Sequence, residues 1–268
     1  MIRGEWRTHK QEQKDWRKRA VALTLIWILL FAASLSLLDF LHSTFESNPQ
    51  GQGILSRIWA GYVVELDLEK PHEQIISVNA SWTVPRVRVV STDAFSSAWI
   101  GIGGRFDKTL IQAGTEHDSV NGKEYYSAWY ELLPDAAVRI PDLDISAGDL
   151  IKASITLVNS EKSEWLIQIY DVSKGREFHQ TFIYNSSQIS AEWIVESPTV
   201  KEQVSMLANF GTITFMDAYT KIGDTVGNIS RFSYSQIIMT NELSVQLASV
   251  SPLSFDGTSF NVTYLKSN

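Results

Sequence analysis

From Ile58 to the C-terminus the sequence is built of short runs in which apolar and polar residues alternate. β-branched and aromatic residues dominate these runs, and turn residues such as Ser173-Lys174-Gly175 and Asp256-Gly257 separate them. Period-two alternation sends successive side chains to opposite faces of a strand. Many short strands at regular spacing indicate an all-β sandwich or barrel. The sequence therefore predicts strands over residues 151–158, 164–170, 177–184, 191–196, 211–215, 232–240, 243–250 and 260–265, with loops over 134–141 and 142–149.

A different pattern occupies residues 20–41, a run of 22 residues in which Asp39 is the only charge. About 20 apolar residues span a bilayer as a helix, whereas the apolar part of a secretory signal is about 7–15 residues long. Basic residues 17–19 directly precede the run, and the positive-inside rule places them in the cytoplasm. We therefore expect one N-terminal transmembrane helix, a signal anchor that holds the protein in the cell membrane with its main domain extracellular. The alternative is a signal peptide cut near residues 32–36, which would release a secreted protein.

These patterns divide the chain into four expected parts. Residues 1–19 form a basic cytoplasmic tail, 20–41 the anchor and 42–56 a flexible linker containing the polar stretch SNPQGQG. Residues 57–268 form one β-sandwich domain, which is large enough to bury a core without cross-links.

Charge and composition exclude several kinds of function. Seven basic and three acidic residues give the tail a net charge of +4, so the remainder of this −7 chain carries −11. A nucleic-acid partner needs a basic face, and the acidic body argues against one. The absence of cysteine removes disulfides, thiolate metal sites and cysteine nucleophiles together.

The common hydrolytic motifs are also missing. The sequence has no G-x-S-x-G, no H-E-x-x-H, no P-loop, and no D-T-G or D-S-G pair. We therefore expect neither a metal nor an organic cofactor. What remains are carboxylates and amides in strands: alternation puts Glu192 and Glu196 on one face of their strand, Gln112 on a face with Glu116, and Trp129 with Glu131. The sequence does not show whether these faces meet.

A series of motifs occurs in a particular order between residues 59 and 215. They read WAG at 59–61, VNASWTVP at 78–85, SAWIGIGG at 97–104, LIQAG at 110–114, YSAWYE at 126–131, ISAGD at 145–149, AEWIVE at 191–196 and FGTITF at 210–215. In this order the motifs resemble the eqolisin family of glutamic peptidases.

The resemblance implies a fold and a site. The fold is an antiparallel β-sandwich of two large sheets, of the concanavalin A-like or jelly-roll type. Gln112 and Glu196 match the family's catalytic pair, and Trp99 matches a tryptophan of its cleft. With Trp129, Tyr130, Glu131 and Glu192, Trp99 forms the expected substrate-binding set. Two positions depart from the fungal pattern, in which Gly103 and Ser127 are both replaced by aspartate.

The implied activity is acid endopeptidase cleavage of polypeptides by a monomer that needs no cofactor. Glu196 would act as general base and then acid, and Gln112 would stabilise the oxyanion. A carboxylate base suits work in acid, where a histidine base would be protonated.

Two alternatives remain beside this reading. A lectin-like sandwich could bind glycans or peptides without cleaving them, and a structural cell-surface module would have no cleft. A glycosidase would need two carboxyls closer together than Glu192 and Glu196, which lie about 13 Å apart at roughly 3.3 Å per strand residue.

Overall fold

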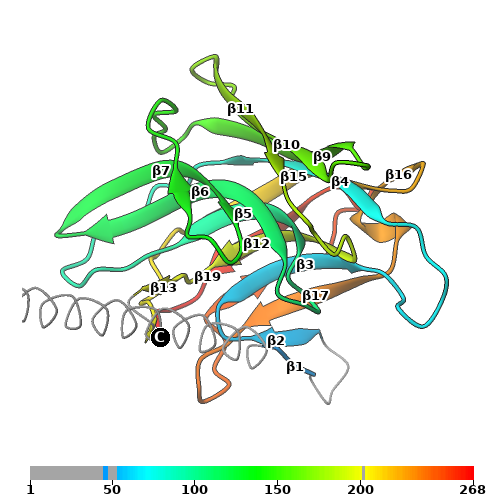
Figure 1. Cartoon of the computed structure of the whole chain (residues 1–268). Coiled ribbons are helices and arrows are strands. Elements are labelled where there is room, and N and C mark those ends of the chain that lie inside the picture. Colours follow the sequence, from blue (N-terminus) through cyan, green and yellow to red (C-terminus); the bar gives the residue numbers. More distant parts are fainter. Residues whose placement is uncertain (1–44, 48–52, 201–202) are drawn as a thin grey trace, which may run out of the picture. The chain divides into compact units, whose positions relative to one another are not determined.

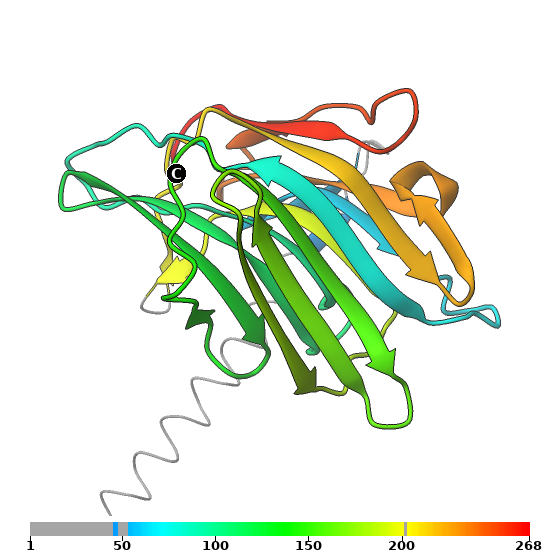
Figure 2. The same cartoon turned by 90° about the horizontal axis from the view of Figure 1, so that it is seen from above.

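The computed structural model describes residues 45–47, 53–200 and 203–268, which belong to one compact unit. Two large curved sheets pack face to face (Figure 1; Figure 2). Within the described residues the only helix is the 3-10 turn η1 (Ile229–Arg231). The all-β sandwich of two large sheets predicted from the sequence is confirmed.

The first sheet has nine strands. In order across the sheet they are β1 (Phe45–Ser47), β2 (Ile54–Ser56), β17 (Tyr234–Met239), β3 (Trp59–Glu65), β12 (Ser190–Glu196), β5 (Ser97–Gly103), β6 (Leu110–Val120), β7 (Lys123–Leu132) and β8 (Val138–Arg139). All neighbours are antiparallel except β2 and β17, which run parallel. The order brings β12, from the second half of the chain, between β3 and β5.

The second sheet has eight strands. They are β11 (Arg176–Ile183), β10 (Glu164–Asp171), β9 (Leu150–Asn159), β4 (Ile75–Thr83), β15 (Thr212–Ile222), β19 (Phe260–Tyr264) and β18 (Ala248–Val250), with β16 (Thr225–Asn228) paired to β15. A separate hairpin joins β13 (Thr199–Val200) and β14 (Gln203–Val204).

The core lies between the sheets. Alternate residues of the nine-stranded sheet, among them Ile100, Ala113 and Trp193, face Trp82 and Ile155 of the other sheet, and all of them are buried in one cluster. Because side chains alternate, the residues between them on each strand lie on the outer face. This alternation decides which side chains can form a site.

At the N-terminal end the structure differs from the expected domain layout. β1 and β2 fall inside residues 42–56, which were expected to be linker, and β2 pairs with β17. The expected tail (1–19) and anchor (20–41) lie outside the described residues. Among the residues that are described, no helix has the length and apolar character to cross a membrane.

Candidate active site

The predicted site residues come from four neighbouring strands, β12, β5, β6 and β7. The register pairs Glu192 with Gly101, Gly101 with Gln112, and Gln112 with Glu131, which places them in one row across the sheet. Glu196 lies in a parallel row, paired with Ser97 on one side. Both rows alternate with core residues, so they face outward together. The faces that the sequence could not connect therefore meet.

Glu196 is held by two tryptophans. The Trp99 indole N–H donates to its Oε2 over 2.8 Å, and the Trp59 side chain also hydrogen-bonds it. The two indoles meet edge to face, with ring centroids 5.0 Å apart. Burial raises the pKa of Glu196 to about 7, with a further rise from the charge of Glu131, while the indole donors oppose the rise. A carboxyl with this pKa can both accept and release a proton between mildly acid and neutral pH.

Gln112 is oriented by Glu131 on the next strand. Gln112 Nε2 donates to Glu131 Oε2 over 2.5 Å, and the Gln112 side chain is only slightly exposed. Gln112 Oε1 is buried and has no hydrogen-bond partner among the described residues. Burial raises the pKa of Glu131 to about 6, although the bond from Gln112 lowers it. One amide hydrogen and one amide oxygen of Gln112 therefore remain available to a reacting group.

Trp129 lies on the same face, paired with Gly114. A Cβ on Gly114 would come within 2.5 Å of Trp99 Cβ, so glycine is needed here for Trp99 to pack close to the sheet. Tyr130, by contrast, points to the opposite face, where it packs against the core and stacks on Phe178 with ring centroids 5.6 Å apart. The structure does not bring Tyr130 to the other predicted binding residues.

Glu192 is fully buried on the outer face, apart from Gln112 and Glu196. In the row it is separated from Gln112 by Gly101, which is covered by the side chains of Trp99 and Leu110. Neither carboxyl oxygen of Glu192 makes a well-formed hydrogen bond to a described residue. Burial is the largest cause that raises its pKa well above the ordinary value.

The neighbours of Glu192 carry mixed charge. Asp107 and Glu65 raise its pKa further and Arg105 lowers it, while Arg105 Nε also lies 3.6 Å from Glu65 Oε2. The surroundings of Glu192 therefore favour its protonated form.

Two residues of the face were not among the predicted site residues. Trp59 belongs to a motif used for the resemblance, but its contact with Glu196 depends on β12 pairing with β3, which no local pattern reveals. Asp118 follows Glu116 on the same face of β6, and burial together with the Glu116 charge raises its pKa to about 8. Within the described ranges, no group of three or more His, Cys, Asp or Glu side chains could hold a metal ion.

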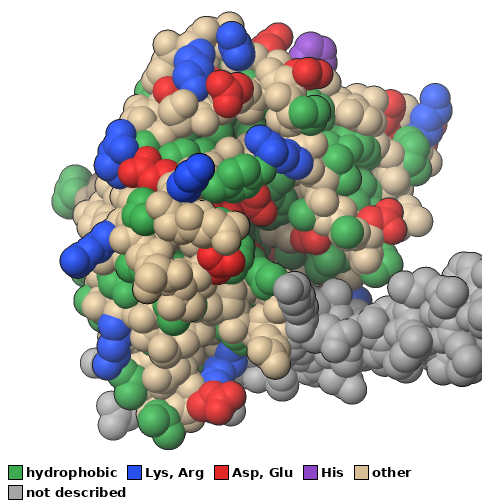
Figure 3. Space-filling model, turned by 90° about the vertical axis from the view of Figure 1, so that its left-hand side faces the viewer, with side chains coloured by type: hydrophobic (Ala, Val, Ile, Leu, Met, Phe, Trp, Pro, Cys, Tyr) green, Lys and Arg blue, Asp and Glu red, His purple; other side chains and the backbone are tan. Residues whose placement is uncertain are grey.

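On the surface, Figure 3 shows acidic and hydrophobic side chains meeting in a hollow on the side of the molecule where the tips of β6 and β7 stand. Such a mixture of apolar lining and a few polar groups is typical of ligand sites.

Comparison with known proteins adds to this geometry. The Peptidase A4 family matches residues 57–264, most of the chain. The chain belongs to this family. The resemblance to the eqolisin glutamic peptidases predicted from the sequence is thereby confirmed, and its family and fold are those of a glutamic endopeptidase.

One curated relative of this chain shows how much of the sequence is shared. Aspergillopepsin-2 of Aspergillus niger is 35% identical over 143 residues, which cover 51% of this chain and 50% of that protein. The chain thus spans about half the length of the curated relative that it matches.

Two solved structures share the fold. Scytalido-glutamic peptidase with a transition-state analogue inhibitor matches with a TM-score of 0.65 and 20% identity, over 78% of this chain and 98% of the other. Aspergilloglutamic peptidase from Aspergillus niger matches with a TM-score of 0.56 and 29% identity, over 64% and 99%.

The two departures from the fungal pattern have local structural counterparts. Gly103 has φ +91°, and a Cβ there would approach the Thr109 carbonyl oxygen to 2.4 Å, so this backbone does not admit aspartate without shifting. Ser127 Oγ donates to Glu116 Oε2 over 2.6 Å. The Ser127 hydroxyl can donate this hydrogen bond to the Glu116 carboxylate at any pH, because the hydroxyl does not titrate in this range.

Proposed function

We propose that this member of the peptidase A4 family is a glutamic endopeptidase that hydrolyses peptide bonds in polypeptides, with Gln112 and Glu196 as its catalytic residues. One observation carries the proposal. Glu196, with a pKa raised to about 7 and two indole donors, shares an outer sheet face with a buried amide that has an unpaired oxygen.

The proposed reaction begins with a water molecule between the two side chains. Glu196 as carboxylate removes a proton from the water, which attacks the carbonyl carbon of the scissile bond. The Nε2 hydrogen of Gln112 that Glu131 does not use donates to the developing oxyanion, and Gln112 Oε1 holds the water. Glu196 then gives its proton to the leaving amine. Every step uses side chains of this chain.

Around the pair, Trp99, Trp129 and Glu131 are proposed to line the substrate cleft. Trp99 is fully buried and Trp129 is nearly so, so their indoles support this cleft from below, and Glu131 orients Gln112. Glu192 supports the face from within, since it is fully buried. Tyr130 has no part in this cleft because it faces the core.

For the location of the enzyme, we propose that residues 20–41 anchor it in the cell membrane as a single-pass protein with its catalytic domain outside. The support is the length and apolar character of this run and the basic residues before it. In untreated cells the whole chain should be recovered in the membrane fraction. Protease added to intact cells should digest the domain. Recovery of the domain in the medium would instead favour a cleaved signal peptide.

The catalytic proposal is tested with the full-length chain, because β2 lies upstream of residue 57 and pairs with β17. Cleavage of an unfolded protein is followed from acid to neutral pH for the wild type, Glu196→Gln and Gln112→Ala. Both variants should lose activity while remaining folded, and the exposed Glu161→Gln should keep its activity and its melting temperature. A folded wild type that binds polypeptides or glycans but cleaves nothing at any pH would favour the lectin-like alternative.

A further inference from the structure

A second cavity lies away from the catalytic face, at the side of the sandwich where both sheets end. Its volume is about 390 Å³, and its walls are residues 177–180 of β11 and the segment 138–143, which begins with β8. β8 is the last strand of the nine-stranded sheet and β11 the last strand of the eight-stranded sheet. We call this cavity the edge groove.

One edge of β11, which forms a wall of the groove, has no partner strand among the described residues. β11 pairs with β10 over all eight of its residues and with no other strand of the described chain. An edge strand with unpaired N–H and C=O groups is a template for an added strand, and proteins usually protect such edges. β11 contains no proline, and its final residue, Ile183, is 66% exposed. The ligand chemistry that suits this edge is an extended polypeptide backbone.

The floor of the groove is apolar. Tyr130 and Phe178 stack with an interplanar angle of 11°, and Ile140 and Leu143 are buried beside them. Gln180 pairs with the core residue Ile167, so its exposed side chain points to the inner side, at the open end of the sandwich. The rim carries both signs of charge in Arg139, Asp142 and Glu177, and it also holds the His179 ring. An extended peptide with an apolar side chain fits this lining better than a strongly charged ligand.

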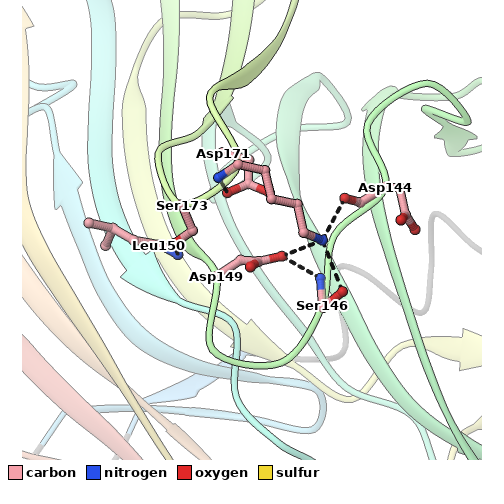
Figure 4. Close-up of polar contacts among 7 residues, drawn as sticks. Asp144, Ser146, Asp149, Leu150, Asp171 and Ser173 are labelled. Carbon is pink, nitrogen blue, oxygen red and sulfur yellow. Dashed lines mark hydrogen bonds and ion pairs between the residues drawn. The ribbon is translucent and has the colours of Figure 1, made fainter.

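Polar contacts hold the two walls together at one end (Figure 4). Lys174, just before β11, donates from Nζ to the Asp144 carbonyl and to Ser146 Oγ over 2.9 Å, and forms an ion pair with Asp149 at 2.8 Å. Asp144 directly follows the other wall. Asp171 Oδ1 accepts from the Lys174 backbone N–H over 3.1 Å. A groove fixed in this way loses less conformational entropy when a ligand binds.

The groove and the proposed cleft lie on opposite faces of β7. Successive residues of β7 place Trp129 and Glu131 on the catalytic face and Tyr130 in the groove. Because β8 is the edge strand of its sheet, a polypeptide that leaves the cleft across β7 and passes around β8 comes to β11.

We propose that the edge groove is an exosite, in which an extended segment of the substrate polypeptide, remote from the cleaved bond, adds as a strand to β11. The proposal rests on the proposed peptidase function and names the part of its substrate that the catalytic face does not hold. Binding at the groove should favour long unfolded polypeptides over short peptides.

The first test fills the groove. Gln180→Trp is compared with Gln168→Trp, a matched change on β10 at an exposed position whose neighbours on that strand, Ile167 and Ile169, face the core. Cleavage is measured on an acid-unfolded protein and on a short peptide that spans only the catalytic face. Gln180→Trp should raise KM for the long substrate by about tenfold, the effect expected from losing a few net hydrogen bonds, and leave the short peptide unaffected. Equal effects on both substrates, or none on either, would overturn the exosite.

The second test does not depend on cleavage. Since the chain has no cysteine, Gln180→Cys in the full-length Glu196→Gln background accepts a single photo-crosslinker. The unfolded protein should be captured, and an excess of the short peptide should not prevent this. Capture of a second copy of this chain alone, or no capture, would refute the proposal. If the wild type cleaves neither substrate, the peptidase proposal fails. The crosslink still shows in that case whether the groove binds an unfolded polypeptide.

Discussion

Trp99 donates its indole N–H to Glu196 from the neighbouring strand, and the same indole covers Gly101, the residue between Glu192 and Gln112. One side chain thus opposes the rise that burial causes in the pKa of Glu196, and it lies between Glu196 and the second buried glutamate of the same strand. This arrangement gives the first two predictions, both on the pH dependence of cleavage.

Trp99→Phe should move the acid limb of the kcat/KM profile to higher pH. The donor stabilises the ionised form of Glu196, and removing it allows burial to raise the pKa further above about 7. Trp165→Phe is the control, since Trp165 Nε1 donates to the Tyr184 carbonyl on the other sheet and its loss should lower stability without moving the profile. An unchanged acid limb in Trp99→Phe would show that Glu196 is not the base.

Glu131→Gln should have the opposite effect. The Glu131 carboxylate raises the pKa of Glu196, so an uncharged amide should lower that pKa and extend activity to more acid pH. A glutamine oxygen can still accept from Gln112, so kcat should fall by less than in Gln112→Ala. A profile that moves toward neutral pH would contradict the assigned electrostatics.

The free energy of unfolding should fall as pH rises from about 4 to 8. Burial raises the pKa values of Glu192, Asp118, Glu196 and Glu131 in the folded state above the unfolded value of about 4.3 for glutamate and 3.9 for aspartate. Each of these groups contributes its full stabilisation of the folded protein at pH values below its pKa in the unfolded state. The contribution is lost as pH rises through its pKa in the folded state. Denaturant titrations at pH 4, 6 and 8 measure this slope.

Glu192→Gln should flatten the same slope, because the amide imitates the protonated acid. At pH 8 the variant should be more stable than the wild type. An identical slope in the variant would mean that Glu192 is ionised at low pH inside the protein.

Gly103→Asp should destabilise the domain by about 2 kcal/mol or more, because the position combines φ +91° with a 2.4 Å approach to the Thr109 carbonyl. Gly175→Asp, at φ +64° with no atom within 4 Å of an added Cβ, separates the backbone effect from the collision. Thermal melts compare the two. Equal losses would show that the loop after Gly103 adjusts freely.

Local patterns predicted the strands well where alternation was regular. The run expected at 151–158 is β9 (Leu150–Asn159), and that expected at 164–170 is β10 (Glu164–Asp171). The position of Tyr130 also follows from alternation, because neighbours of Trp129 and Glu131 must face the other way.

Other features depend on pairing between distant segments and could not be read locally. Trp59 contacts Glu196 only because β12 lies beside β3, and β2 became a strand because β17 offers it an edge. In the sequence, Ser127 differs from the fungal pattern only by lacking the carboxylate of an aspartate. The register places Ser127 opposite Glu116, which accepts its hydrogen bond.

The insertion of β12 between β3 and β5 has a consequence for how the protein gains its activity. The donors to Glu196 are made early in synthesis, on strands that have no hydrogen bonds to each other, and the sheet between them is completed only when a strand from the second half of the chain arrives. Such long-range closure is slow and comes late in folding. A nascent or truncated chain that ends at residue 189 therefore carries every earlier motif and still lacks Glu196, the proposed general base, so it should have no activity.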